Sequence, residues 1–368
     1  MKKVLLAASL LTFGMAAQAQ SSVTLYGRLD AGLEYISGLT NGTGGSTHRF
    51  KAESGDWGTS LWGMKGVEDI GGGNKVLFQL EGSFNTMNGT GPGGGGLFNR
   101  WATVGMSNNQ FGTLLLGREL FISNGVWDFD PFGQSNWSSA SLVRGRNWPQ
   151  SSNNVSYQSP KLGGFDFYGQ YALSNATSWN GNGTTPQGRE GGAQITYTNA
   201  LFQVRGLYDE IRSPANGQFT DAFAASREYS ALVNVFLGQF KIQGAYQAIR
   251  TSSAADASVN PTSLDHEWGG VTWQATPAAA LIAAVYHVNA NKGGGNATIY
   301  TIGGSYNLSK RTLLDIQIAH ARNSSTANFG LEANAAGAGG PQPDGSFNDN
   351  PLPGHSQTGV YAGIQHSF

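Results

Sequence analysis

The stretch VTLYGRLDAGLEY, residues 23–35, alternates strictly between two kinds of side chain. Leu25 and Leu29 fall on one parity, whereas Arg28 and Asp30 fall on the other. Successive side chains of a β-strand point to opposite faces of the sheet. The stretch therefore predicts a strand with one apolar face and one charged face.

The first 19 residues resemble an export signal. Lys2 and Lys3 form a basic start, residues 4–17 are mostly apolar, and Ala17-Gln18-Ala19 offers a small-x-small cleavage site. The apolar run is too short for a membrane-spanning helix, which needs about 20 residues. We predict a signal peptide over residues 1–19 and a single domain over residues 20–368. Strands that are apolar outside and polar inside, in an exported chain, are typical of an outer-membrane β-barrel.

The composition excludes several classes of function. Without Lys2 and Lys3 the chain has 20 basic and 23 acidic residues, a net charge near −3 that gives no basis for nucleic-acid binding. It has no cysteine, which excludes thiol catalysis and thiolate metal sites. Fifty-four glycines, 41 aromatic residues and only 12% charged residues suit a barrel with tight turns and aromatic side chains at the membrane interfaces.

Strand-like segments of about ten residues recur along the whole chain. Sixteen are predicted, at residues 23–35, 59–67, 75–84, 98–105, 112–118, 154–158, 164–172, 191–198, 201–209, 228–237, 239–250, 265–274, 279–289, 297–306, 312–321 and 357–368. The number is even, as closure of an antiparallel bacterial barrel requires. The predicted fold class is all-β, a sixteen-stranded antiparallel transmembrane β-barrel.

Short and long connections alternate along the predicted chain. The long ones include residues 37–57, 174–187 and 323–356, and such loops lie outside the cell in barrels of this kind. One connection, between Arg118 and Asn154, breaks the alternation of lengths because it has about 35 residues. Its six Phe and Trp side chains favour a packed loop.

Several short motifs occur in order from one end of the chain to the other. They are SSVTLYG at 21–27, WGMKGVEDIG at 62–71, FQLE at 78–81, FGT at 111–113, YQSP at 157–160, YNLSKRT at 306–312 and GIQHSF at 363–368. Together they resemble Gram-negative general porins of the neisserial and burkholderial type. The resemblance implies a homotrimer in the outer membrane whose third loop folds into the barrel and narrows a water-filled pore for small hydrophilic solutes and ions.

The resemblance also implies wall arginines that face acidic groups on the third loop and favour small anions. Arg100 stands where one wall arginine is expected, but Leu61 and Gln150 stand where others would be. We therefore expect only weak ion selectivity. The terminal Phe368 resembles the recognition signal for the barrel-assembly machinery, and lipopolysaccharide and outer-membrane lipid are expected neighbours.

Eight charged residues are candidates for lining the constriction. They are Arg28, Glu81, Arg100 and Arg118 on the wall, and Asp128, Asp130, Arg144 and Arg146 on the long connection. The alternative for the wall residues and the two aspartates is an ordinary solvated charge, and Arg144 and Arg146 could instead tether the loop. Charged groups at a narrow point of a channel bias which ions enter.

No cofactor, metal site or catalytic residue is expected. The six histidines are scattered and show no metal-ligand spacing. Three other functions stay open at this point: a solute-selective channel with a dedicated lumenal pocket, an outer-membrane enzyme, and an adhesin or lectin barrel that binds a partner through its long loops.

Overall fold

A computed structural model describes residues 22–41, 43–91, 96–133, 135–173, 188–252, 260–332 and 349–368. The predicted signal peptide, residues 1–19, and the predicted connection at 174–187 lie outside the described residues. The strands are β1 Ser22–Thr40, β2 Ser46–Glu53, β3 Leu61–Gly71, β4 Asn74–Ser83, β5 Trp101–Asn108, β6 Gly112–Leu120, β7 Gln150–Gln158, β8 Phe165–Ala172, β9 Glu190–Thr198, β10 Phe202–Ile211, β11 Arg227–Leu237, β12 Phe240–Arg250, β13 Ser263–Gln274, β14 Ala279–Ala290, β15 Gly295–Asn307, β16 Thr312–Asn323 and β17 Gln357–Ser367.

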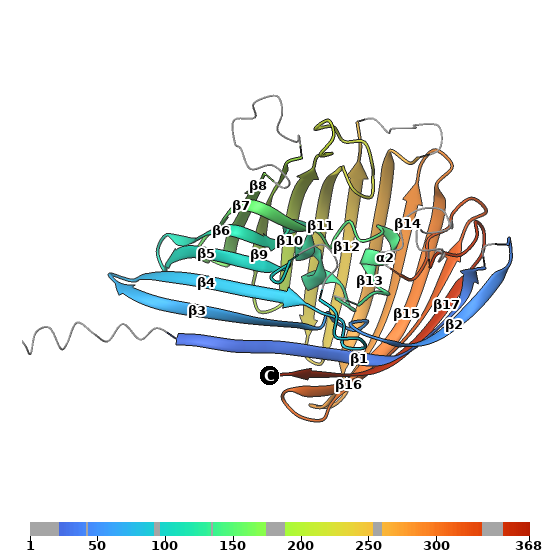
Figure 1. The fold of residues 1–368 in the computed structure, drawn as a ribbon, viewed down its shortest axis with the longest axis horizontal. Helices are drawn as coiled ribbons and strands as arrows, with labels where there is room; N and C mark the ends of the chain where they lie inside the picture. The colour runs from blue at the N-terminus through green and yellow to red at the C-terminus, as the bar shows by residue number, and fades with distance from the viewer. Residues whose placement is uncertain are drawn as a thin grey trace, which may run out of the picture.

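The strands form one antiparallel sheet that closes into a barrel (Figure 1). Strand β1 pairs with β17 along one edge, from Arg28 opposite Ser367 to Ser37 opposite Thr358. Along its other edge β1 pairs first with β3 and then with β2. Strands β2 and β3 are thus two halves of one strand of the barrel, interrupted by residues 54–60, which we call the insert. The barrel therefore has sixteen strands, as predicted.

Some predicted boundaries are wrong at the ends of strands. Residues 37–57 were expected to be a connection, but β1 runs on to Thr40 and β2 follows at Ser46–Glu53. Strand β5 begins at Trp101, three residues after the predicted start, and β7 begins at Gln150, four residues before it. Beyond the bilayer the outer face need not be apolar, so the alternation fades while the ladder hydrogen bonds continue.

The predicted faces of the strands are confirmed by exposure. The side chains of Leu25 and Ile316 point outward and are 61% and 47% exposed, whereas Asp30 and Glu34 point inward and are buried. Lipid offers no hydrogen bonds, so a closed barrel with an apolar outer face satisfies its own backbone groups. Within the described ranges, no helix has the length and apolar character for crossing a membrane.

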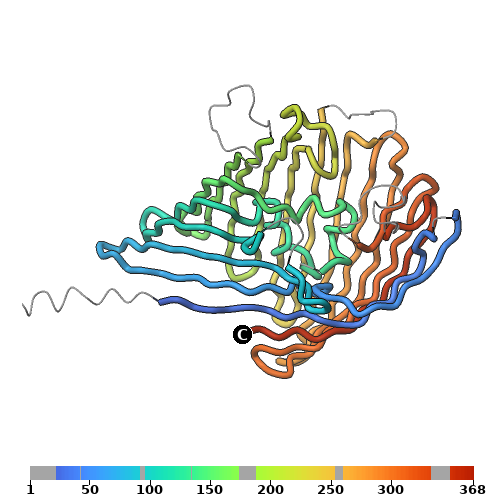
Figure 2. The backbone as a smooth tube through the Cα atoms, in the orientation of Figure 1, coloured from blue at the N-terminus to red at the C-terminus, as the bar shows by residue number. Residues whose placement is uncertain are grey.

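Residues 121–149, which we call the inner loop, fold into the barrel (Figure 2). The loop contains the short helices η1 (Ile122–Phe129) and α2 (Ser139–Leu142). Helix η1 contacts β9 to β12, and α2 contacts β14.

One side of the inner loop packs against the wall formed by β11 to β17. Phe129, Trp137 and Leu142 are fully buried there, against wall residues that include Trp268 and Tyr286. Burying each large apolar side chain contributes roughly 1.5–3 kcal/mol. The prediction of a packed loop is confirmed. Open space borders the inner loop on the side that faces away from the wall of β11 to β17.

Candidate channel constriction

The opposite side of the inner loop borders a polar cavity of about 610 Å³. Trp127, Asn136 and Trp148 line it from the inner loop, and Arg100 lines it from the facing wall. The insert, the segment between β4 and β5, and Glu332 also line it. The apolar contacts fill the other side of the loop, so this cavity is the polar space between the loop and the wall at the ends of β4 and β5.

Arg100 and Glu81 form an ion pair on this wall. Glu81 lies in β4 and Arg100 directly precedes β5, so the pairing of these two strands brings the side chains together. Arg100 Nε donates to Glu81 Oε1 at 2.7 Å, and Tyr26 Oη donates to Glu81 Oε2 at 2.9 Å. Both charged groups are largely buried. The guanidinium is therefore partly neutralised at the place where the family resemblance puts a wall arginine.

The two other predicted wall arginines lie on neighbouring strands. In β1, Arg28 Nε donates to the backbone oxygen of Thr59 in the insert at 2.8 Å. In β6, Arg118 Nε donates to the backbone oxygen of Asn99 at 2.5 Å, and its Nη1 donates to Ser152 Oγ. The structure thus places all four predicted wall residues on β1 and β4 to β6 or next to them.

The two loop aspartates have different surroundings. The carboxylate of Asp128 accepts from Arg205 Nη1 at 2.8 Å and is still 62% exposed. Asp130 is buried, and it accepts from Tyr286 Oη at 2.6 Å and from the backbone N–H of Ser139 at 2.9 Å. Burial raises the pKa of Asp130, although these hydrogen bonds oppose the shift. Asp128 therefore faces water, while Asp130 fastens the loop.

Arg146 lies in a buried charged cluster at the end of the inner loop. Its Nη2 donates to Asp209 Oδ1 at 2.5 Å, its Nε donates to Ser226 Oγ at 3.0 Å, and Glu228 lies 3.8 Å from its Nη1. Burial opposes the charge of Arg146, but the two carboxylates outweigh burial and raise its pKa. The geometry places Arg146 where it tethers the loop to β10 and β11.

Arg144 also lies at a contact between loops. Its guanidinium is 4.5 Å from the centre of the Phe223 ring, and its Nη2 donates to Asn328 Oδ1 at 2.9 Å. Burial lowers the pKa of Arg144 to about 10. Of the two roles open to this residue, tethering the loop fits these contacts better than lining the pore.

Sequence reasoning missed several residues of this site. One of them is Arg205, which pairs with Asp128. Its lumenal position could have been predicted, because it alternates with Val204 and Gly206, which point outward from β10. The edge-to-face pair of Trp127 and Trp148, with ring centres 6.3 Å apart, depends on the fold of the loop and has no local sequence signal.

A closed sixteen-stranded barrel with an apolar outer face and a loop folded into its lumen defines a channel of the outer membrane. The family model described as Gram-negative porin matches residues 6–326, and the chain belongs to this family. It is an outer-membrane porin, and it forms a water-filled channel for passive diffusion.

Similar proteins cover most or all of the chain. Outer membrane porin protein 32 of Delftia acidovorans is 31% identical over 385 residues, and the alignment covers the whole of both chains. An outer membrane porin protein of Bordetella pertussis is 34% identical over 249 residues, which cover 62% of this chain and 64% of that protein. Among solved structures, the anion-selective porin from Comamonas acidovorans has a TM-score of 0.76 at 24% identity, over 95% of this chain and all of the other.

Proposed function

We propose that this porin is a general channel with weak ion selectivity, whose narrow part lies between the inner loop and the wall around Arg100. The observation that carries this proposal is the polar cavity of about 610 Å³ on the one side of the inner loop that apolar packing leaves open. A polar passage in which the charges of Arg100 and Asp128 are paired admits small hydrophilic solutes and ions alike.

The pairing of charges supports weak selectivity. Arg100 lies 2.7 Å from Glu81, and Asp128 lies 2.8 Å from Arg205, so the field of each charge is largely offset by its partner. Leu61 and Gln150 carry no charge at positions where the family resemblance leads one to expect arginine. The Comamonas porin is described as anion-selective, and this chain would be less so.

Reconstitution in a planar bilayer tests the proposal. We expect discrete conductance steps and a reversal potential close to zero in a salt gradient, and liposome swelling that falls with solute size. A large reversal potential of either sign would reject weak selectivity. Much faster entry of one sugar than of others of equal size would show a solute-selective channel instead.

We propose further that the porin is a homotrimer without enzymatic activity, embedded in lipid and lipopolysaccharide, and that Phe368 addresses it to the barrel-assembly machinery. One structural neighbour, OmpT of Vibrio cholerae with a TM-score of 0.65, is described in a trimer form. We expect an oligomer in unheated SDS samples of native extracts and a shift in mobility on boiling. A monomer in unheated samples would contradict the trimer.

A further inference from the structure

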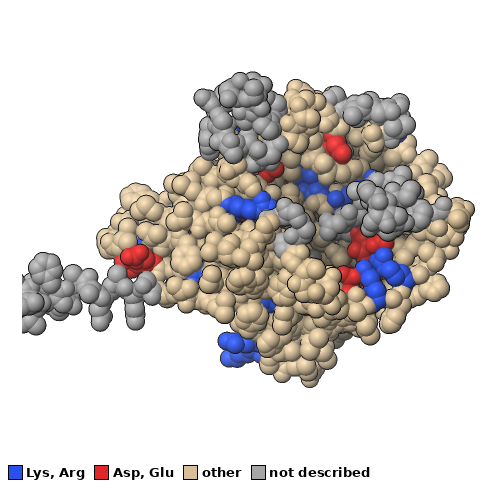
Figure 3. Space-filling view, viewed as in Figure 1, with Lys and Arg blue, Asp and Glu red and all other residues tan. Residues whose placement is uncertain are grey.

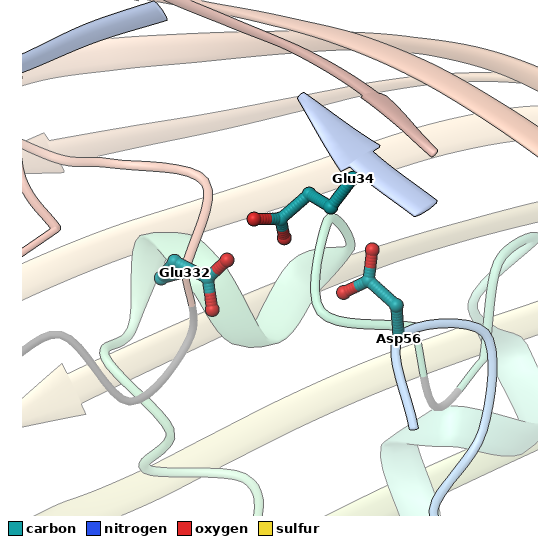
Figure 4. Close-up of side chains that lie close together, drawn as sticks. All are labelled: Glu34, Asp56 and Glu332. Carbon is teal, nitrogen blue, oxygen red and sulfur yellow. The ribbon is translucent and has the colours of Figure 1, made fainter. Parts of the chain in front are cut away.

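Three acidic side chains from distant parts of the sequence meet inside the barrel. Glu34 lies in β1, Asp56 in the insert, and Glu332 in the segment between β16 and β17. One carboxylate oxygen of each lies within 4.8 Å of the others. Figure 4 shows the three carboxylates pointing toward one another. Among the described residues, this is the one group of three or more such side chains with the spacing of metal ligands.

Each of the three carboxylates has one oxygen without a hydrogen-bond partner among the described residues. Glu34 Oε1 faces Arg49 and Lys51 at 3.4 Å, and Asp56 Oδ1 accepts from Asn136 Nδ2 at 2.7 Å. The oxygens Glu34 Oε2, Asp56 Oδ2 and Glu332 Oε1 are buried and accept no hydrogen bond from any described residue. Glu34 and Asp56 have no exposed surface at all. Buried polar atoms normally have a partner, so these three oxygens lack one at a common point.

The charges of the neighbourhood do not balance. Arg49 pairs with Asp349 at 2.6 Å, and Lys51 pairs with Glu53. Two basic side chains thus face five carboxylates of the described chain: Glu34, Glu53, Asp56, Glu332 and Asp349. Figure 3 shows acidic and basic side chains next to one another on the viewed face of the molecule. Buried like charges are costly unless protons or a cation neutralise them.

From this geometry we propose that Glu34, Asp56 and Glu332 bind a divalent metal cation of the hard, oxygen-preferring class, with calcium as the preferred ion. All three ligands are carboxylates, which calcium and magnesium prefer. Calcium accepts irregular arrangements of six to eight oxygens, whereas magnesium demands a near-ideal octahedron. Three carboxylates on one strand and two loop segments suit calcium, and water from the cavity that Glu332 lines would complete its shell.

The bound cation would connect three parts of the barrel. It joins β1 to the insert and to the segment that leads into β17, and Asp56 also holds Asn136 of the inner loop. Protons compete for the same site, because burial and the charge of Glu34 raise the pKa of both Asp56 and Glu332 well above the usual range. Ligands must be deprotonated to bind metal, so affinity rises with pH.

Terbium luminescence tests the proposal directly. Terbium binds calcium sites, and Trp57, next to Asp56 in the chain, can sensitise its emission. The full-length porin is refolded in detergent free of lipopolysaccharide, stripped with EDTA, and titrated with terbium and then with calcium at neutral pH. The variants are Asp56→Asn and Glu332→Gln, with Glu68→Gln at the exposed end of β3 as the matched control.

We expect a calcium-displaceable signal in the wild type and in Glu68→Gln, and a loss of affinity of about tenfold or more in the other two variants. We also expect calcium to raise the unfolding temperature of the wild type and of Glu68→Gln only. In EDTA the unfolding temperatures of the two site variants should be no lower than that of the wild type, because each variant removes a buried charge. This measurement also establishes that the variants fold. An equal terbium signal in all four proteins, or none in the wild type, would overturn the proposal. Displacement by magnesium but not calcium would overturn the choice of ion.

Discussion

Each side chain on a barrel strand faces either lipid or the lumen, and the cost of a charge depends on which of the two it faces. Ile316 points outward and is 47% exposed, whereas Asp315 beside it points inward and is buried. The sequence predicted these faces well, because alternation with period two is a local property that lipid enforces where a strand crosses the bilayer.

We expect Ile316→Arg to impair assembly by about 2–4 kcal/mol if the position lies near the midplane of the bilayer. Ser305→Arg is the matched control, since Ser305 pairs with Asp315 in β16 and so faces the lumen, where a guanidinium can meet that carboxylate. The stability of both variants is measured by urea titration in lipid vesicles, with the heat-modifiable band as the readout for folded protein. Equal midpoints for the two variants would show that the assignment of faces is wrong.

Selectivity is also decided at single residues. Arg100→Ala leaves Glu81 without its partner at 2.7 Å, and the reversal potential in a salt gradient should move toward cation preference. Asp128→Asn leaves the charge of Arg205 uncompensated and should move it toward anion preference. Both shifts should shrink at high salt, since screening acts over about 10 Å at 0.1 M.

Asp69→Asn, at the exposed end of β3, is the control for both changes and should leave the reversal potential unchanged. If neither Arg100→Ala nor Asp128→Asn differs from this control, these residues do not line the constriction. Asp130 is a poor choice for the same test, because its carboxylate holds Tyr286 and Ser139 and its loss would disturb the loop.

At the scale of elements, the inner loop decides the shape of the passage. Its length and aromatic content predicted a packed loop, and burial of Phe129 and Trp137 confirms this. The wall against which it packs could not be predicted. Leu232, Ile249 and Ile299 break the polar pattern of the lumenal face, but only the closed barrel brings them to one side.

The loop should lose its fixed position when Arg146 is replaced. Arg146→Gln leaves Asp209 and Glu228 as buried, uncompensated charges, and breaking a buried pair in this way costs about 3–5 kcal/mol. We expect noisier single-channel currents and faster proteolysis within the loop, while the barrel itself stays folded. Arg146→Lys keeps the charge but not the fork of donors, and should fall between the wild type and Arg146→Gln. A quiet, protease-resistant Arg146→Gln channel would argue against the tether.

At the scale of the whole molecule, the number and order of the strands followed from the sequence, because a barrel must have paired edges and must close. The sequence did not reveal β2, whose outer face carries few large apolar residues. It also did not reveal the meeting of Glu34, Asp56 and Glu332. Their approach depends on the register between β1 and β17, which joins the two ends of the chain.

Closure itself depends on one small residue. Gly27 and Phe368 exchange two backbone hydrogen bonds, of 3.2 and 3.1 Å, where the last residue meets β1. A Cβ at Gly27 would lie 2.3 Å from Cζ of the Phe368 ring and 2.8 Å from the backbone oxygen of Leu61. The ring can rotate away, but the backbone of β3 cannot, so a methyl group at Gly27 pushes β1 and β3 apart.

We therefore expect Gly27→Ala to lower the stability of the refolded barrel by about 1–3 kcal/mol, the usual cost of overpacking. Gly206→Ala is the matched control, because the nearest atom to a Cβ there is Ile195 Cγ2 at 3.9 Å. Urea midpoints in detergent, followed by the heat-modifiable band, compare the two without the assembly machinery. Adding Phe368→Leu to Gly27→Ala should restore part of the loss, since it removes the ring but leaves the contact with Leu61. A midpoint for Gly27→Ala equal to that of Gly206→Ala would mean that β1 has room for a side chain at position 27, between β3 and the chain end.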